Sequence, residues 1–142
     1  MDNQIISLSV DLHRDFNDRL GEPLINHCRR MANRALIFKW DDLIVKGCYL
    51  HDVLNLHYGT YYETMDMIKA VDERVAWLAD KAAKKEMESW PQYYYRVLTV
   101  PEATKLIWLD MTDELPIADF EQYHRFIDYL PRFYRKLFIE KN

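Results

Sequence analysis

The chain has 142 residues and a formal net charge of −4, and 49% of its residues are hydrophobic and 14% aromatic. This length suits one domain around one hydrophobic core, and this composition is typical of a folded protein rather than a disordered one. We therefore expect a single domain over residues 1–142. The lack of a basic excess argues against a nucleic-acid polymer as partner, whereas a small anionic ligand remains possible where a metal supplies positive charge.

The location of the protein is predicted from its apolar runs and its cysteines. The first residues contain no run like that of a secretory signal, and no run approaches the roughly 20 apolar residues that cross a bilayer. We expect a cytoplasmic protein with no membrane partner. Cys28 and Cys48 form no CxxC motif, so we expect buried free thiols rather than a disulfide or zinc ligands.

Three helices are predicted in the first part of the chain. Apolar residues recur at spacings of three and four, which is the period of an α-helix, while the alternation of a strand is rare. Gly21 and Pro23 separate the first helix from the second, and Asp41 or Asp42 can cap the third. We expect these helices at residues 4–18, 24–36 and 42–56. The apolar face of the first consists of Ile5, Leu8, Leu12 and Phe16.

The rest of the chain is also predicted to be helical. Residues 57–62 are expected to form a loop, after which helical spacing runs from residue 65 to 78 and then ends in a charged, solvated helix end at 80–88. The capping-box pattern at residues 99–102, with Pro101 in the first turn, predicts another helix start. A last helix at 118–140 contains Pro131, which kinks or splits it. Together these segments predict an all-α bundle of about six to eight helices.

An adjacent pair, His51 and Asp52, lies in an apolar segment. Burying both side chains is costly unless a partner satisfies them, and a divalent cation is one such partner. His27 borders the apolar face of the second helix, and Asp110 lies in the apolar row of its own helix, so all four side chains can converge in a bundle core. Imidazole and carboxylate ligands suit manganese, iron or zinc, and an ion with open positions can polarise a phosphoryl oxygen and activate water.

Whether His51 and Asp52 can bind the same metal ion depends on the geometry of the helix. Adjacent residues of a helix point about 100° apart. His51 and Asp52 can therefore share one ion only if the ion lies between their directions or if the helix frays at this point.

The order His…His-Asp…Asp resembles the HD-domain metal-dependent phosphohydrolases, and most of all the hydrolase domain of the alarmone synthetase-hydrolases and the small alarmone hydrolases. Residues 21–27 are similar to that family's G-x-P-Y-x-x-H segment, residues 49–54 to its L-L-H-D-hydrophobic segment, and residues 105–110 to its K-L-x-K-L-A-D helix. The resemblance spans about residues 5–115. It implies an all-α HD bundle that acts on a nucleotide through a divalent metal, most simply manganese. The implied metal ligands are His27, His51, Asp52 and Asp110.

The chain departs from this family at two places. Alarmone hydrolases follow the His-Asp pair with Glu-Asp, which orients the attacking water, whereas this chain has Asn55 and Leu56. The family's Asn four residues after the last ligand is Glu114 here, which we assign to substrate binding together with Arg19. We assign catalytic roles to Asn55, which can hydrogen-bond to the water but not take its proton, and to Glu63 and Asp113; His57, Glu63 or Asp113 can replace the missing acid or base.

Alternatives to this interpretation remain open at the level of sequence. One is a catalytically inactive HD-fold module that binds a nucleotide or a protein, and another is a helical interaction protein with residues 120–137 as a dimer seam, although the last helix more simply closes the core. The segment 90–95 holds an aromatic cluster that can pack under a loop or stack on a base. The remaining histidines, His13, His57 and His124, are expected at or near the surface.

Overall fold

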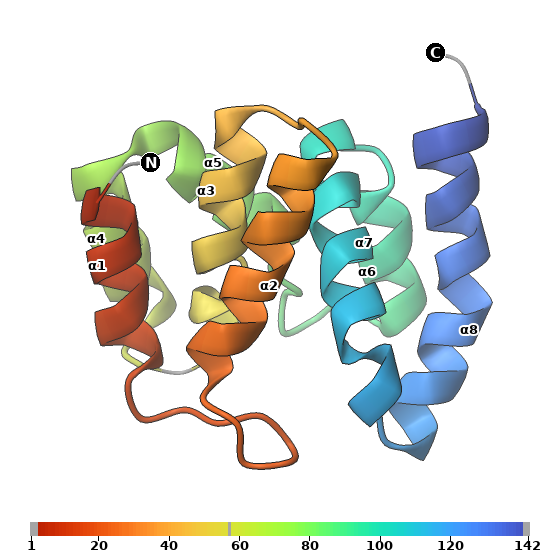
Figure 1. Ribbon diagram of the computed structural model, residues 1–142, viewed down its shortest axis with the longest axis horizontal. Helices are drawn as coiled ribbons and strands as arrows, with labels where there is room; N and C mark the ends of the chain where they lie inside the picture. Colours follow the sequence, from red (N-terminus) through yellow and green to blue (C-terminus); the bar gives the residue numbers. More distant parts are fainter. Residues whose placement is uncertain (1–2, 57, 141–142) are drawn as a thin grey trace.

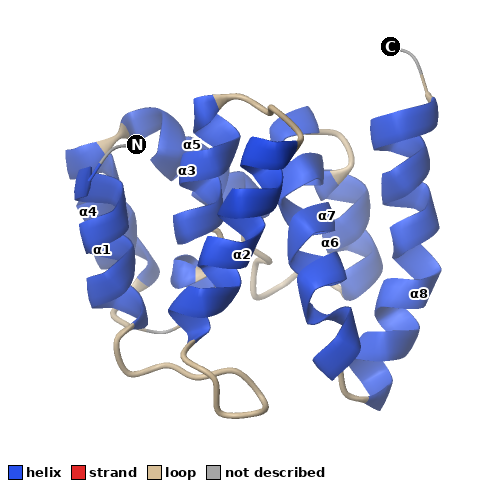
Figure 2. Ribbon diagram, in the orientation of Figure 1, coloured by secondary structure: helices blue, strands red, loops and turns tan. Residues whose placement is uncertain are grey.

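The computed structural model describes residues 3–56 and 58–140, and within them the chain forms eight α-helices and no strand (Figures 1 and 2). The predicted all-α class is therefore confirmed. The helices are α1 (Asn3–His13), α2 (Leu24–Ile37), α3 (Asp42–Leu50), α4 (Tyr61–Val71), α5 (Glu73–Ala82), α6 (Trp90–Val97), α7 (Pro101–Glu114) and α8 (Phe120–Tyr134).

Two of the first three helices are shorter than predicted, because local hydrogen bonds end them. After α1 the chain turns at Asp18, whose Oδ1 accepts hydrogen bonds from the backbone N–H groups of residues 20 and 22, and Gly21 takes a φ of 88°. The helix α3 begins as predicted, with Asp41 accepting from the backbone N–H of Ile44. It ends at Leu50 and is followed by a 3₁₀ turn, Val53–Asn55, so His51 and Asp52 lie just beyond the helix.

The second half differs more from the prediction. The helical spacing of residues 65–78 is interrupted at Asp72, which caps the start of α5 with its side chain. The helix α6 was not predicted, although Ser89 and Gln92 form a capping box at its start. The helix α7 begins at Pro101 as expected, but without the predicted capping box, because the Thr99 hydroxyl donates to the carbonyl of Arg96 instead. The last helix passes through Pro131 and ends in a π-helical turn, Arg135–Ile139.

The helix α7 lies at the centre of the bundle. It contacts α2, α3, α5, α6 and α8 (Figure 1). Close packing at the crossing of α3, α5 and α7 depends on Gly47, where a Cβ would lie 2.6 Å from Leu78 Cδ2 and 3.4 Å from Leu106 Cδ2. Both leucines are fully buried. The position of Asp110 on α7 is therefore fixed by helices from both halves of the chain.

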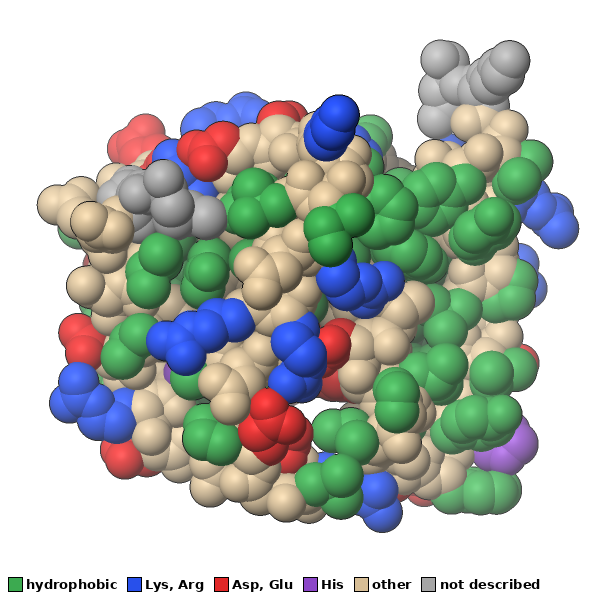
Figure 3. Space-filling view, viewed as in Figure 1, with side chains coloured by type: hydrophobic (Ala, Val, Ile, Leu, Met, Phe, Trp, Pro, Cys, Tyr) green, Lys and Arg blue, Asp and Glu red, His purple; other side chains and the backbone are tan. Residues whose placement is uncertain are grey.

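The last helix covers the core with only part of its apolar surface. Its buried residues are Phe126 and Phe133, whereas Ile127 is 45% exposed and Phe120 78% exposed. Figure 3 shows apolar side chains gathered along α8 on the outer surface. The last helix does close the core, since it packs on α7 and Leu130 lies partly buried against the core, but much of the repeat at residues 120–137 faces outward because it is offset by one position from the buried row. Within the described residues, no helix is long and apolar enough to cross a membrane.

We expect Gly47→Ala to lower the free energy of unfolding by about 1–3 kcal/mol, because the added methyl overpacks the crossing of three helices. In an unobstructed helix the same change would raise it by up to about 1 kcal/mol, since alanine is the better helix former. Urea unfolding followed by circular dichroism measures the difference. A stabilised variant would contradict the close approach of α3, α5 and α7.

Candidate metal centre

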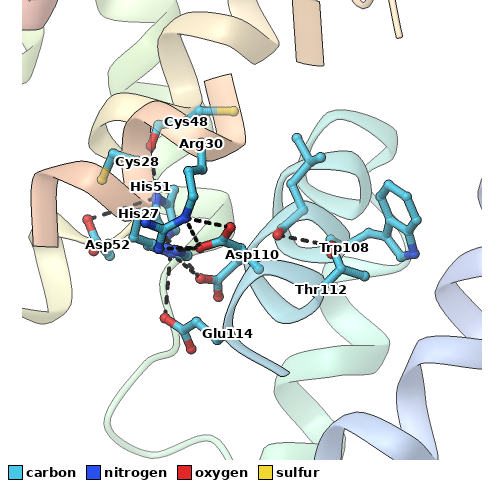
Figure 4. Close-up of polar contacts among 12 residues, drawn as sticks. His27, Cys28, Arg30, Cys48, His51, Asp52, Trp108, Asp110, Thr112 and Glu114 are labelled. Carbon is cyan, nitrogen blue, oxygen red and sulfur yellow. Dashed lines mark hydrogen bonds and ion pairs between the residues drawn. The ribbon is translucent and has the colours of Figure 1, made fainter. Parts of the chain in front are cut away.

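Three of the four predicted ligands converge at one point between α2, α3 and α7 (Figure 4). His27 Nε2 lies 2.8 Å from Asp110 Oδ1, and His51 Nε2 lies 3.2 Å from the same oxygen. The two Nε2 atoms are 3.3 Å apart. His27 and His51 are each 3% exposed, while the Asp110 side chain is 22% exposed and faces a cavity.

The hydrogen-bond partners of the Nδ1 atoms show which ring nitrogen carries the hydrogen in His27 and His51. His27 Nδ1 lies 2.7 Å from Asp113 Oδ2, and His51 Nδ1 lies 2.9 Å from the backbone carbonyl oxygen of Cys48. A carbonyl and an ionised carboxylate only accept hydrogen bonds, so Nδ1 donates in both rings. A neutral histidine that donates from Nδ1 has its lone pair on Nε2. Two nitrogen lone pairs and a carboxylate oxygen therefore face one another.

A divalent cation fits this arrangement. Donor atoms bonded to one ion at about 2.0–2.2 Å lie roughly 2.9–3.4 Å apart, and the three separations here are 2.8, 3.2 and 3.3 Å. Two neutral imidazoles and one carboxylate form a set with a single negative charge, and none of them is a thiolate. Such donors accommodate manganese, iron or zinc.

The electrostatics of the cluster favour positive charge at its centre. Burial lowers the pKa of His27, but hydrogen bonds to Asp110 and Asp113 outweigh it and raise this pKa to about 10. Burial raises the pKa of Asp110, but the two histidines outweigh it and hold this pKa well below its usual range. The carboxylates that attract a proton to the rings attract a metal ion in the same way, and each metal ion bound there replaces the protons.

Asp113 supports this centre from behind rather than facing the cavity. It accepts from His27 Nδ1 and also pairs with Arg30, whose Nη2 lies 2.9 Å from Asp113 Oδ2. These partners hold the pKa of Asp113 at about 2, despite the opposing effect of burial. Asp113, predicted as a catalytic acid or base, is thus a residue that orients a ligand.

Asp52, the fourth predicted ligand, points to a different group. Its Oδ1 lies 2.7 Å from His13 Nε2 and 3.9 Å from His51 Nδ1. The geometric condition noted above applies here: the two adjacent side chains leave the backbone in different directions, and Asp52 turns toward α1. The expectation of a surface position for His13 is wrong, since this residue is 2% exposed. Its spacing of eight from buried Ile5 would have placed it on the inner face of α1.

A cavity of about 1050 Å³ opens beside the three donors. Asp110 and Glu114 lie on its wall next to the histidines, and Glu114 Oε1 is 3.5 Å from His27 Nε2. Burial and the negative charge of Asp110 raise the pKa of Glu114 above its usual range. The other walls combine aromatic residues with charges of both signs, since Asp80 and Glu86 lie there beside three basic residues. They include Tyr61, Tyr62, Trp90, Tyr93, Tyr94, Lys84, Lys85 and Arg125.

The basic side of the cavity is a feature that the sequence analysis missed. Residues 80–88 were expected to be a solvated helix end, but α5 stops at Ala82 and the loop after it folds against the bundle. Arg96 fixes this loop by donating to Glu88 and to the carbonyls of Lys81 and Ala83. Arg125 of α8 lies with its guanidinium carbon 3.7 Å from the Trp90 ring centroid. The aromatic residues at 90–95 thus contribute both to the core and to a cavity wall.

The remaining predicted site residues lie in different places. Asn55 lines the cavity, and its Nδ2 donates to the backbone carbonyl of Lys84 at 3.1 Å. Arg19 is exposed and donates to the carbonyl of Ile117. Glu63 is exposed in the first turn of α4. Neither Arg19 nor Glu63 is among the described residues that line the cavity. His57 lies outside the described residues.

Comparison with protein-family models and with curated proteins identifies no relative of this chain. No known family model matches the sequence, and no curated protein is detectably similar to it. The geometry of the site and the segments quoted above are therefore the basis for its interpretation.

We expect Asp113→Ala to weaken metal binding by about 10- to 100-fold, because the substitution removes the acceptor that orients the His27 ring. Isothermal titration of the metal-free protein with Mn²⁺ or Zn²⁺ measures the change. Asp128→Ala is the matched control, since Asp128 is exposed on α8. Equal affinities in the two variants would contradict the orienting role of Asp113.

The loop that carries the lysines is expected to loosen in acid. The hydrogen bond from Arg96 lowers the pKa of Glu88 from 4.5 to about 2. A lowered pKa contributes stability that is fully present above pH 4.5 and is lost as the pH falls toward 2. The difference in unfolding free energy between the wild type and Glu88→Gln should therefore shrink over this range. A difference that stays constant with pH would exclude this ion pair as its source.

Proposed function

We propose that the chain is a metal-dependent phosphohydrolase of the HD-domain type that acts on a nucleotide or a related small phosphoester. The observation that carries the proposal is the convergence of His27 Nε2, His51 Nε2 and Asp110 Oδ1 at the wall of a large cavity lined by aromatic and charged residues. The order of these residues in the chain supports it, because together with Asp52 it resembles the HD pattern, although Asp52 is paired with His13 in this structure. The all-α bundle is consistent with the same family.

The metal would be held by His27, His51 and Asp110, with Asp113 orienting His27. Manganese is the first choice, with iron and zinc as alternatives, since all three accept mixed imidazole and carboxylate ligands. When bound, such an ion supplies Lewis-acid polarisation of a phosphoryl oxygen and an acidified water. The free thiols of Cys28 and Cys48 fit a reducing, cytoplasmic location for this activity.

The cavity residues would bind the substrate by two kinds of contact. Lys84 and Arg125 offer positive charge to phosphate groups, while Lys85 is paired with Asp80, and Arg can bind a phosphate through two parallel hydrogen bonds. Tyr62 is an exposed aromatic side chain on the cavity wall and can stack on a base, whereas the Trp90 ring is already covered by Arg125. This division of basic and aromatic groups favours a nucleotide over a simple phosphoester.

Glu114 is our candidate for proton transfer, in place of the Glu-Asp pair of the alarmone hydrolases. Its carboxylate lies next to His27 and on the cavity wall. A carboxyl group with a raised pKa is suited to exchange protons near neutral pH. Asn55 can only hydrogen-bond, and Asp113 is already paired with Arg30.

The first test is the metal content of the purified protein, with phosphate release measured on a panel of nucleotides. We expect about one firmly bound manganese or iron at this centre, and we expect Asp110→Asn to lose both this metal and turnover while remaining folded. Asp128→Asn is the matched control and should keep both. An Asp110→Asn protein that retains metal and activity would overturn the assignment of this site.

A second test concerns substrate binding. We expect Arg125→Ala to raise KM for a nucleotide by about tenfold or more, because a charged hydrogen bond to phosphate is lost. The metal content should not change, since Arg125 contacts Tyr94 and Trp90 rather than the three donors. Arg132→Ala, an exposed arginine on the same helix, is the control. An unchanged KM would exclude this wall of the cavity from phosphate binding.

The second candidate function is an HD-fold module that binds a nucleotide without hydrolysing it. The hydrogen bond between Asn55 and the Lys84 carbonyl favours it, because this amide is engaged in holding a loop and has no proton to exchange. In that case equilibrium dialysis would detect nucleotide binding, and phosphate release would stay at background even with the metal site filled.

A further inference from the structure

We propose a second metal site, formed by His13, Cys28 and Asp52, which takes a thiophilic divalent cation such as Zn²⁺. The three residues come from α1, from α2 and from the turn after α3, and their candidate ligand atoms all lie within 4.8 Å of one another. This site is separate in chemistry from the first, because it contains a thiol. The proposal does not depend on the phosphohydrolase activity.

The donor atoms meet around His13 Nε2. Asp52 Oδ1 lies 2.7 Å from this nitrogen, and Cys28 Sγ lies 3.5 Å from it. Ligands of a tetrahedral zinc ion with bonds of about 2.0 Å to nitrogen and 2.3 Å to sulfur are separated by roughly 3.5 Å. The nitrogen and sulfur are thus already at the required distance, the carboxylate oxygen is closer to the nitrogen than the metal requires, and the sulfur and oxygen lie within 4.8 Å of each other.

The His13 ring is oriented from behind, as in the first site. Its Nδ1 lies 2.8 Å from the backbone carbonyl oxygen of Ser9, which can only accept, so Nδ1 donates. The Ser9 hydroxyl donates to the carbonyl of Tyr49 at 2.7 Å and lies 3.1 Å from the same nitrogen. In neutral His13 the lone pair on Nε2 therefore faces the thiol and the carboxylate. An orienting contact of this kind commonly accompanies a metal-binding histidine.

The three side chains of this group are largely shielded from water, so they must satisfy one another or bind an ion. Cys28 is fully buried and His13 is 2% exposed, while the Asp52 side chain is 20% exposed. Without a metal, the group is satisfied by a proton on His13 Nε2, which forms an ion pair with Asp52. With zinc, Cys28 would bind as a thiolate with its proton passing to solvent, and the ion would take the place of the proton between His13 Nε2 and Asp52.

The chemistry of the thiol selects the metal. Thiolate ligands favour zinc over manganese or magnesium, which prefer oxygen donors. Contrary to the expectation from the sequence, Cys28 is then a zinc ligand, whereas Cys48 keeps its predicted role as a buried free thiol. Asp52 is used at this second site, which explains why its carboxylate does not point to His27, His51 and Asp110.

The test is cobalt substitution of the full chain, because a thiolate bound to Co²⁺ gives an intense charge-transfer absorption in the near ultraviolet. We expect the metal-free wild type to bind about two Co²⁺ ions per chain and to develop this band. Cys28→Ser should lose the band and one of the two ions. Cys48→Ser is the matched control, since it removes the other buried cysteine, and it should retain both.

A separate variant distinguishes the two sites. His51→Ala should lose the first ion and keep the thiolate band, so failure of the proposed hydrolase site would leave this result unchanged. If Cys28→Ser does not fold, the zinc-loaded wild type is still informative, because X-ray absorption must detect a sulfur ligand at about 2.3 Å. A folded wild type with no thiolate band and no sulfur ligand, or a band that Cys48→Ser removes and Cys28→Ser does not, would overturn the proposal.

Discussion

The arrangement of the centre depends on two hydrogen bonds that lie behind the candidate ligands. Because His27 and His51 both donate from Nδ1, to Asp113 and to the Cys48 carbonyl, their Nε2 atoms are left facing each other and Asp110. Three acceptors at 2.8–3.3 Å in a nearly dry site repel one another unless positive charge lies among them. The bundle is thus built so that its centre requires a cation, whether protons or a metal ion.

The packing of α7 makes this arrangement rigid. The helix contributes Asp110, Asp113 and Glu114, and it contacts helices from both halves of the chain. Asp110 and Glu114 line the cavity from this helix, while Asp113 of the same helix orients His27, so the carboxylate behind the ligand and those that face the cavity come from one element. A small shift of α7 would therefore change the metal site and the cavity together.

Helical periodicity predicted most of the fold, and the reasons for its failures are local. The spacing of apolar residues located α2, α3 and α7 and turned His27 and His51 inward. It missed the break at Asp72 and the helix α6, because a side-chain cap and a short aromatic segment leave no long apolar stripe. Helical periodicity could not predict the pairing of Asp52 with His13, because that contact joins residues 39 positions apart and depends on the approach of α1 to α3.

His51 and Asp52 are adjacent in the chain but belong to different candidate sites. The helix α3 ends at Leu50, so the two residues leave the backbone in different directions and serve different groups of donors. His51 Nδ1 and Asp52 Oδ1 are nevertheless only 3.9 Å apart. Two cations held this close would repel each other, so each group binds its ion most favourably when the two carboxylates stay on their own sides of the turn. The turn at residues 51–52 therefore keeps two adjacent side chains in separate groups of donors.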